Sequence, residues 1–184
     1  MTINQDQLNN YFSGPWRERM RGLDEFEYTG YSLIEKVQPG ERVIDVGCGM
    51  NLFKGRIPNL IGIDPAFPEA DVQQSLEEYA NSPVVTRFNV AFCLGSINFG
   101  TQADIEHQIG LVVNRLLHTK GSRIYWRSNP RQYDHGNDQQ HELEFYNWSF
   151  EEHHRLAELF GFTVTDIQWD TRNRIYAEWT QKAS

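Results

Sequence analysis

The sequence has 184 residues, a length that suits a single domain. Hydrophobic residues make up 39% and charged residues 23%, which allows a packed core and excludes a largely disordered chain. The net charge of −8 disfavours extended nucleic-acid binding, because that depends on Lys and Arg facing the phosphates.

Cysteine usage and hydropathy bear on localisation. Only two cysteines occur, Cys48 and Cys93, which is not a disulfide framework and favours a reducing compartment. No apolar run reaches the length of a membrane helix, and the first residues lack the basic and apolar regions of a signal peptide. We therefore expect a cytoplasmic protein with no membrane segment.

The N-terminal 1–40 has the pattern of a helical cap ahead of a core at 41–184. Its first apolar residues recur at the spacing of one helical face: Leu8, Tyr11 and Phe12. Gly14-Pro15 is expected to end this helix, and a further helix is expected to end at Pro39-Gly40. This basic, aromatic segment fits a cover over a binding site and a solvated helix surface equally well.

Apolar and β-branched runs predict the strands, which are expected at 42–46, 60–64, 70–73, 88–94, 123–127, 162–169 and 174–179. The run at 88–94 is almost continuously apolar, as in a parallel strand covered on both faces. The last two runs lie so close in sequence that they can pair only as an antiparallel hairpin.

Helical spacing predicts a short segment of barely two turns, a single turn and two longer helices, at 52–57, 76–79, 101–117 and 150–160 respectively. Ser149 is placed to cap the last helix, with Glu152 at capping-box spacing. His153 and His154 are interpreted as solvated residues on that helix.

The segment from Arg42 to Asn51 is a buried strand followed by a glycine turn. Gly47 and Gly49 remove two side chains where backbone can approach a ligand closely, and Asp45 stands near the strand end. Asp64 ends the next strand about 20 residues later, the spacing at which an acid binds a ribose in adenosine-cofactor folds.

At these residues the sequence resembles the class I S-adenosylmethionine-dependent methyltransferases. Asp45-Val46-Gly47-Cys48-Gly49 is similar to the first motif of that family, and Asp64 falls where its ribose-binding acid stands. The usual third glycine is replaced by Asn51, the non-glycine type that best tolerates a positive φ. The resemblance covers about 40–180.

The resemblance implies an α/β fold in one domain, 1–184: a three-layer Rossmann-like sheet, mostly parallel, with a C-terminal antiparallel hairpin. The hairpin argues against a nicotinamide dehydrogenase, because class I methyltransferases end their sheet with such a pair. Leu52 also stands where a dinucleotide fingerprint requires glycine or alanine.

The same resemblance implies the S-adenosylmethionine site. Asp45 would order the turn or bind the ammonium group of the donor, and Asp64 would accept from the ribose hydroxyls. The other residues expected at the cofactor are Gly47, Cys48, Gly49, Asn51, Pro65, Cys93, Leu94 and Gly95.

The acceptor side depends on the loop after 88–94 and on the polar stretch from 128 to 147. Asn98, Asp134 and His135 are the catalytic candidates, with His135 as a base oriented by Asp134. Three further residues are expected at the acceptor, where the arginines could clamp a carboxylate or phosphate: Arg127, Arg131 and Tyr133. The histidines of this stretch match no recognised metal spacing, so no metal site is assigned.

Two signatures of nucleic-acid base methylation are missing. Leu94-Gly95-Ser96-Ile97 stands where amino methylation of DNA bases uses an Asn/Asp-Pro-Pro-aromatic motif, and neither cysteine follows a proline as in cytosine C5 methylation. The sequence therefore favours methyl transfer to a small or medium-sized acceptor that could be anionic. A module that binds the cofactor without catalysis, or a regulatory subunit, stays an alternative, and the sequence does not indicate the oligomeric state.

Overall fold

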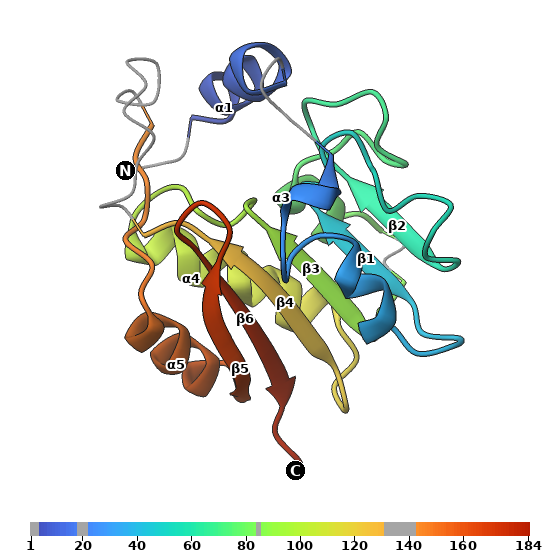
Figure 1. Ribbon diagram of the computed structural model, residues 1–184, viewed down its shortest axis with the longest axis vertical. Coiled ribbons are helices and arrows are strands. Elements are labelled where there is room, and N and C mark those ends of the chain that lie inside the picture. The colour runs from blue at the N-terminus through green and yellow to red at the C-terminus, as the bar shows by residue number, and fades with distance from the viewer. Residues whose placement is uncertain (1–3, 18–21, 84–85, 131–142) are drawn as a thin grey trace.

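A computed structural model describes residues 4–17, 22–83, 86–130 and 143–184. Six strands form one sheet in the order β2-β1-β3-β4-β6-β5 (Figure 1). Their bounds are β1 Val43–Val46, β2 Leu60–Ile63, β3 Val90–Leu94, β4 Arg123–Ser128, β5 Phe162–Asp170 and β6 Arg174–Gln181. The first four are mutually parallel, and β6 runs antiparallel to both β4 and β5. The mostly parallel sheet and its C-terminal hairpin are therefore confirmed.

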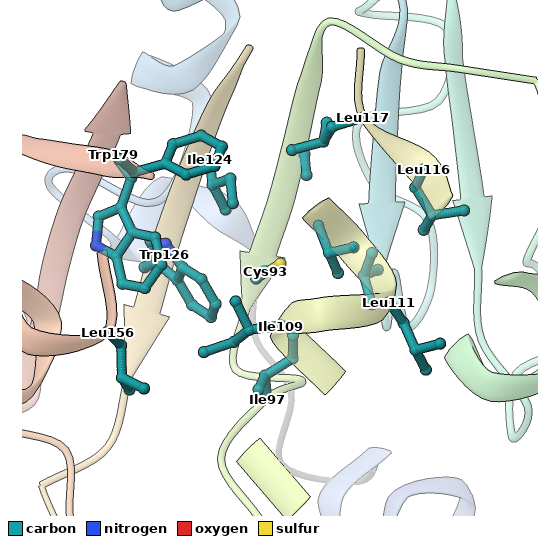
Figure 2. Packing of buried hydrophobic residues seen from close by; sticks show 14 of the residues in the cluster. Cys93, Ile97, Ile109, Leu111, Leu116, Leu117, Ile124, Trp126, Leu156 and Trp179 are labelled. Atoms are coloured by element: carbon teal, nitrogen blue, oxygen red, sulfur yellow. The ribbon is translucent and has the colours of Figure 1, made fainter. Parts of the chain in front are cut away.

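Side-chain alternation along the strands divides the core into two layers. In β3, Val90 and Phe92 pack on one face, while Ala91 and Cys93 pack on the other. The larger cluster lies beneath the helices and includes Trp126 and Trp179, as Figure 2 shows. With cover on both faces, the sheet has the three layers that the sequence predicts.

Three helices cover the larger cluster: α3 Leu76–Ala80, α4 Gln102–Leu111 and α5 Phe150–Leu159. Ser75 and Thr101 close full capping boxes on α3 and α4. Ser149 caps α5 by accepting from the Glu152 N–H at 3.1 Å, but the Glu152 carboxylate accepts from Tyr146 and Arg155 instead of closing a box. No helix in the described ranges is both long and apolar enough to cross a bilayer.

The opposite face has irregular cover. Residues 52–57 form turns without a helix, and the helix expected before Pro39 is only a 3-10 segment, Tyr31–Lys36. Phe53 and Leu33 nevertheless bury their side chains against the sheet, so apolar contact without helical periodicity is enough for this layer. The third strand predicted at 70–73 is reduced to a single bridge between Ile63 and Val72.

The N-terminal α1, Gln5–Tyr11, lies beyond the carboxyl ends of the parallel strands (Figure 1). The predicted break at Gly14-Pro15 is wrong, because a π-helical turn, Phe12–Trp16, continues through it. The wider turn accommodates a proline that has no N–H to donate.

His153 is not solvated as expected; it is completely buried among aromatic rings on the inner face of α5. Trp179 Nε1 can only donate, so it donates to Nδ1 at 3.2 Å, and Nε2 therefore carries the proton toward Ser128 Oγ at 2.7 Å. The ring also stacks on Trp148 at 4.4 Å. Burial lowers the pKa of His153 to about 3, so the folded protein holds a neutral imidazole.

His153 should make stability dependent on acid. Between about pH 6.5 and pH 4, His153 binds a proton in the unfolded chain but not in the folded chain. The free energy of unfolding therefore falls by up to about 1.4 kcal/mol for each unit that the pH is lowered. In His153→Gln this contribution disappears, and urea unfolding should show a shallower pH slope than in the parent. His154→Gln is the control, since His154 is exposed on the same helix. Parallel slopes for the parent and His153→Gln would contradict this assignment.

Candidate functional site

A cavity of about 430 Å³ opens at the carboxyl edge of the parallel strands, where open α/β sheets bind ligands. The ends of β1, β2, β3 and β4 all contribute to its lining. Cofactor candidates in the lining are Asp45, Gly47, Cys48, Gly49, Asp64, Pro65, Leu94 and Gly95. Most of the cofactor residues expected from the sequence are thus brought together.

The turn after β1 is held by the neighbouring strand. The N–H groups of Gly47 and Cys48 both donate to the Ile63 carbonyl, at 2.8 and 3.0 Å. Gly47 has φ +71°, and a Cβ built there would lie 2.4 Å from Ser96 Cβ. Only glycine fits both the left-handed backbone and this close approach.

Asn51 has φ 57°, as the replacement of the third glycine predicts. Its Nδ2 donates to the Glu69 carbonyl at 3.1 Å and to Asp71 Oδ2 at 3.3 Å. These bonds tie the turn to the segment after β2, and Asn51 does not belong to the cavity lining. Its role in the structure is to support the turn.

Asp64 connects the turn to the end of β2. Its carboxylate accepts from the Gly49 N–H at 3.0 Å and from the Ala66 N–H at 2.8 Å. Burial raises the pKa of Asp64, and these N–H groups oppose that rise. The Phe67 N–H also hydrogen-bonds this carboxylate, and of its roughly four lone-pair sites the remainder faces the cavity, where Asp64 is a lining residue.

Asp45 is only 4% exposed and makes no side-chain hydrogen bond to any described residue. Burial, with the nearby charge of Asp64, raises its pKa to about 7. Of the two roles that the sequence left open, ordering the turn therefore has no support in the geometry. A buried acid of this kind is suited to a cationic group in the cavity.

Ser96 is a lining residue that sequence reasoning missed. Its Oγ is buried, has no hydrogen-bond partner among the described residues, and lies 3.4 Å from the Cβ position of Gly47. A buried hydroxyl without a partner is costly unless a ligand or water satisfies it. The Gly-Ser pair after β3 was the available signal, but no sequence spacing distinguishes it from an ordinary loop.

Cys93 differs from its neighbours Leu94 and Gly95. Its side chain is fully buried in the core beneath α4, and it is absent from the cavity lining (Figure 2). Burial raises the pKa of the Cys93 thiol well above its usual range. The structure therefore gives Cys93 a packing role, and its expected contact with a cofactor stays a prediction.

Asn98 lies in the cavity lining on the loop after β3 and is 5% exposed. Its Oδ1 accepts from the Asn129 N–H at 3.0 Å, and its backbone carbonyl accepts from the Tyr146 N–H at 2.8 Å. The amide nitrogen has no hydrogen bond to a described residue. Asn98 thus fastens the loop to the end of β4 and keeps a donor available.

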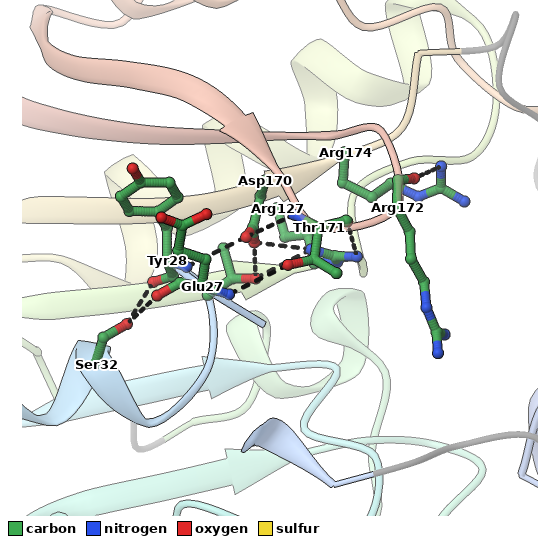
Figure 3. A network of polar contacts seen from close by, with 9 residues as sticks. Glu27, Tyr28, Ser32, Arg127, Asp170, Thr171, Arg172 and Arg174 are labelled. Atoms are coloured by element: carbon green, nitrogen blue, oxygen red, sulfur yellow. Dashed lines mark hydrogen bonds and ion pairs between the residues drawn. The ribbon is translucent and has the colours of Figure 1, made fainter. Parts of the chain in front are cut away.

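Arg127 lines the cavity but its guanidinium also belongs to a buried network, drawn in Figure 3. It donates to Asp170 Oδ2 at 2.8 Å, to Thr29 Oγ1 at 3.2 Å and to the Thr171 carbonyl at 3.0 Å. Burial lowers its pKa to about 10, so it stays charged at neutral pH. This network joins the N-terminal segment, β4 and the hairpin.

The N-terminal helix supplies an aromatic wall that the sequence only partly indicates. Leu8, Tyr11 and Phe12 all line the cavity, as their shared helical face suggests. Phe12 packs edge-on to Phe99 at 5.6 Å, and Phe99 packs on Phe145 at 4.9 Å. An ion pair between Arg17 and Glu69 links the end of this segment to the loop after β2.

Four expected residues lie outside the described part of the chain: Arg131, Tyr133, Asp134 and His135. Their roles stay predictions. Within the described part, no group of three or more His, Cys, Asp or Glu residues is arranged to hold a metal ion.

No protein-family model and no curated protein matches the chain. Among solved structures, it is similar to 1,6-didemethyltoxoflavin-N1-methyltransferase from Burkholderia thailandensis, with a TM-score of 0.72, 15% identity, and coverage of 97% of this chain and 87% of that chain. That structure contains 1,6-didemethyltoxoflavin and S-adenosylhomocysteine.

Two more methyltransferases have similar folds. Magnesium protoporphyrin IX methyltransferase from Synechocystis, with S-adenosylhomocysteine bound, gives a TM-score of 0.67 at 14% identity and covers 97% of this chain and 100% of that chain. The N-methyltransferase NodS from Bradyrhizobium japonicum gives 0.66 at 11% identity, covering 96% and 98%. At these identities the likeness establishes the fold, which is the one expected from the class I methyltransferase resemblance.

The close approach at Gly47 can be separated from its backbone conformation. Gly55 also has a positive φ, +79°, but a Cβ there meets nothing within 4 Å. Gly55→Ala should therefore lower the free energy of unfolding by about 1 kcal/mol, from backbone strain alone. Gly47→Ala should cost roughly 2 kcal/mol more, because the Ser96 Cβ cannot rotate away. Urea unfolding of both variants measures the difference, and equal losses would contradict the contact.

Proposed function

We propose that this protein transfers a methyl group from S-adenosylmethionine to a small or medium-sized acceptor. The observation that carries the proposal is the set of groups at one end of the cavity: a glycine turn, two acids with unused acceptor sites, and the unpartnered Ser96 hydroxyl. They occur on a fold shared with methyltransferases whose structures hold S-adenosylhomocysteine.

The groups present match the parts of this cofactor. The Asp64 carboxylate would accept from the ribose hydroxyls, and Asp45 offers a buried acid to the ammonium group. The amino acid portion would lie along the turn at Gly47 to Gly49, with the Ser96 side chain beside it, since these residues all line the cavity. When bound, the cofactor supplies a methyl group already activated on a sulfonium, so the protein needs mainly to position the acceptor.

The acceptor is proposed to enter between the cofactor end and the aromatic wall. The cavity volume of about 430 Å³ is in the range of small-molecule sites, and apolar rings form much of that side. The Asn98 amide N–H donates to no described residue and would orient an acceptor oxygen or nitrogen there. The proposed roles of His135 as a base and Asp134 as its orienting partner complete the acceptor side, with Arg131 and Tyr133 as further contacts.

Binding and turnover together test the function. Calorimetry should show binding of S-adenosylmethionine and S-adenosylhomocysteine and none of NAD. Transfer from methyl-labelled S-adenosylmethionine to a panel of small acceptors should then be measured. Binding without transfer to any acceptor would favour the non-catalytic module, and failure of both sulfur ligands to bind would reject the proposal.

Asp64 provides a graded test of the ribose contact. Asp64→Ala should weaken S-adenosylhomocysteine binding roughly 100-fold, because the charge-assisted hydrogen bonding to the ribose is lost. Asp64→Asn keeps one acceptor oxygen and should fall between this variant and the parent. Since Asp64 also accepts from Gly49 and Ala66, thermal unfolding of both variants must show that the fold is retained. Unchanged affinity in folded Asp64→Ala would refute the ribose contact.

Asp45 should make cofactor binding dependent on pH. Its pKa of about 7 means that the ligand-free acid takes up a proton as the pH falls through neutrality. Because an ammonium group prefers the carboxylate, S-adenosylhomocysteine should bind up to about tenfold more weakly at pH 6 than at pH 8. Asp45→Asn has no titrating group and should bind weakly with no such dependence. A calorimetric affinity in the parent that is equal at both pH values would rule out the ammonium contact.

A further inference from the structure

The charged residues of the cavity lining are separated across the sheet. Asp45 and Asp64 stand at the ends of β1 and β2, whereas Arg127 ends β4, and Arg172 and Arg174 belong to the β5–β6 turn and the start of β6. The strand order places β3 between these two groups. No other described Asp or Glu lines the cavity, although the protein carries a net charge of −8. One end of the cavity is thus acidic and the other is basic.

Two of the three arginines are buried and held in place. Arg127 is fastened by Asp170 and by the face of Phe26, whose ring centroid lies 4.2 Å from the guanidinium carbon. Arg174 is 6% exposed and donates from Nη1 to the Arg172 carbonyl at 3.1 Å. Because the buried Asp170 carboxylate neutralises Arg127, that guanidinium adds little net field, and its role is to hold this wall of the cavity in place.

Arg172 is different because its side chain is about half exposed and its ion pair lies at the surface. Its backbone has φ 63°, on the turn at the tip of the hairpin, and its side chain extends away from the buried network in Figure 3. Nη2 donates to Glu25 Oε2 at 2.6 Å, but the two side chains are 47% and 27% exposed. Exposed ion pairs contribute little to stability, so an incoming anion can replace Glu25 at low cost.

We propose that the acceptor is an organic anion with an apolar body, whose carboxylate or phosphate binds Arg172 in place of Glu25. The apolar body would lie against the wall formed by Phe12, Phe99 and Phe145. Arg172 supplies planar, two-point recognition of the anionic group, and the Arg174 guanidinium lies at the same end of the cavity. This inference rests on the proposed function, because it assigns the basic end of the cavity to the methyl acceptor.

Three ring compounds of similar size test the preference for charge. Benzoate, phenyl phosphate and neutral benzamide should be titrated by calorimetry into protein saturated with S-adenosylhomocysteine. At least one of the anions should bind roughly tenfold more tightly than benzamide, and added salt should weaken it. The ratio of the benzoate and phenyl phosphate affinities tells which anionic group the site prefers. Equal binding of benzamide and both anions, or binding of none, would overturn the inference.

Opposite changes at the exposed pair give the sharper test. Arg172→Gln should weaken the preferred anion roughly tenfold, whereas Glu25→Gln should bind it severalfold more tightly because the competing carboxylate is gone. A folding defect cannot produce a gain in one variant and a loss in the other. Arg155→Gln is the control, since Arg155 is a half-exposed arginine paired with Glu152 and Glu106, away from the cavity.

Cofactor titrations on the same preparations keep the two proposals apart. Arg172→Gln should leave S-adenosylhomocysteine affinity unchanged, because its side chain is at the other end of the cavity. If S-adenosylhomocysteine binds but Arg172→Gln and Arg155→Gln hold the anion equally well, the anion site is refuted and the proposed function stands. If S-adenosylhomocysteine itself fails to bind, the proposed function is rejected, and so is the assignment of the anion site to the methyl acceptor.

Discussion

The hydrogen bonds between the turn after β1 and the end of β2 decide the shape of the cavity. The Ile63 carbonyl accepts two turn N–H groups, and the Asp64 carboxylate accepts a third from Gly49. These polar groups are buried, and leaving any of them unpaired would cost about 1–3 kcal/mol. The turn can therefore take this form only when β1 and β2 are side by side, which means that the acidic end of the cavity is built by the fold and needs no ligand to form. Pre-organisation of this kind reduces the entropy lost on binding.

The loop after β3 confines the turn after β1 on the side opposite β2. Ser96 approaches Gly47 so closely that no side chain fits between them, and the loop that carries Ser96 is itself fastened through Asn98 to Asn129 at the end of β4. The chain of contacts thus runs from β2 through β1 and β3 to β4, in the order of the sheet. A change at Asn98 would then alter the turn after β1 without contacting it. Kinetic data on Asn98 variants must therefore distinguish this indirect effect from a direct contact with the reacting groups.

Features that arise from local chemistry could be predicted from the sequence, whereas contacts between residues far apart in the chain could not. Predictions that rest on local chemistry were confirmed: the positive φ of Asn51, the Ser149 cap and the hairpin. Burial of His153 could have been predicted from its i, i+3 spacing to Leu156 on the apolar face of α5, because a lone histidine on that face is buried with the rest. The contact of Ser96 with Gly47 and the pairing of Arg127 with Asp170 join residues far apart in sequence, and no local pattern encodes them. Irregular cover on the second face was missed because its apolar residues lack helical periodicity.

The Asp170 carboxylate joins the N-terminal segment to the C-terminal hairpin at the basic end of the cavity. Besides Arg127 from β4, it accepts from the Tyr28 N–H at 3.2 Å and from the Thr29 hydroxyl, both in the N-terminal segment. Leu23 and Leu33, on either side of this contact, are buried against the same face of the sheet. The later part of 1–40 is therefore packed as part of the second layer, and α1 with the turn that follows it is the part that extends to the cavity opening. Asp170 is the last residue of β5, and Arg172 and Arg174 follow it directly in the turn and at the start of β6. One buried carboxylate therefore holds both the N-terminal segment and the basic end of the cavity. Losing that carboxylate would leave the Arg127 charge buried without its counter-ion, which is the costliest kind of polar defect in a protein interior.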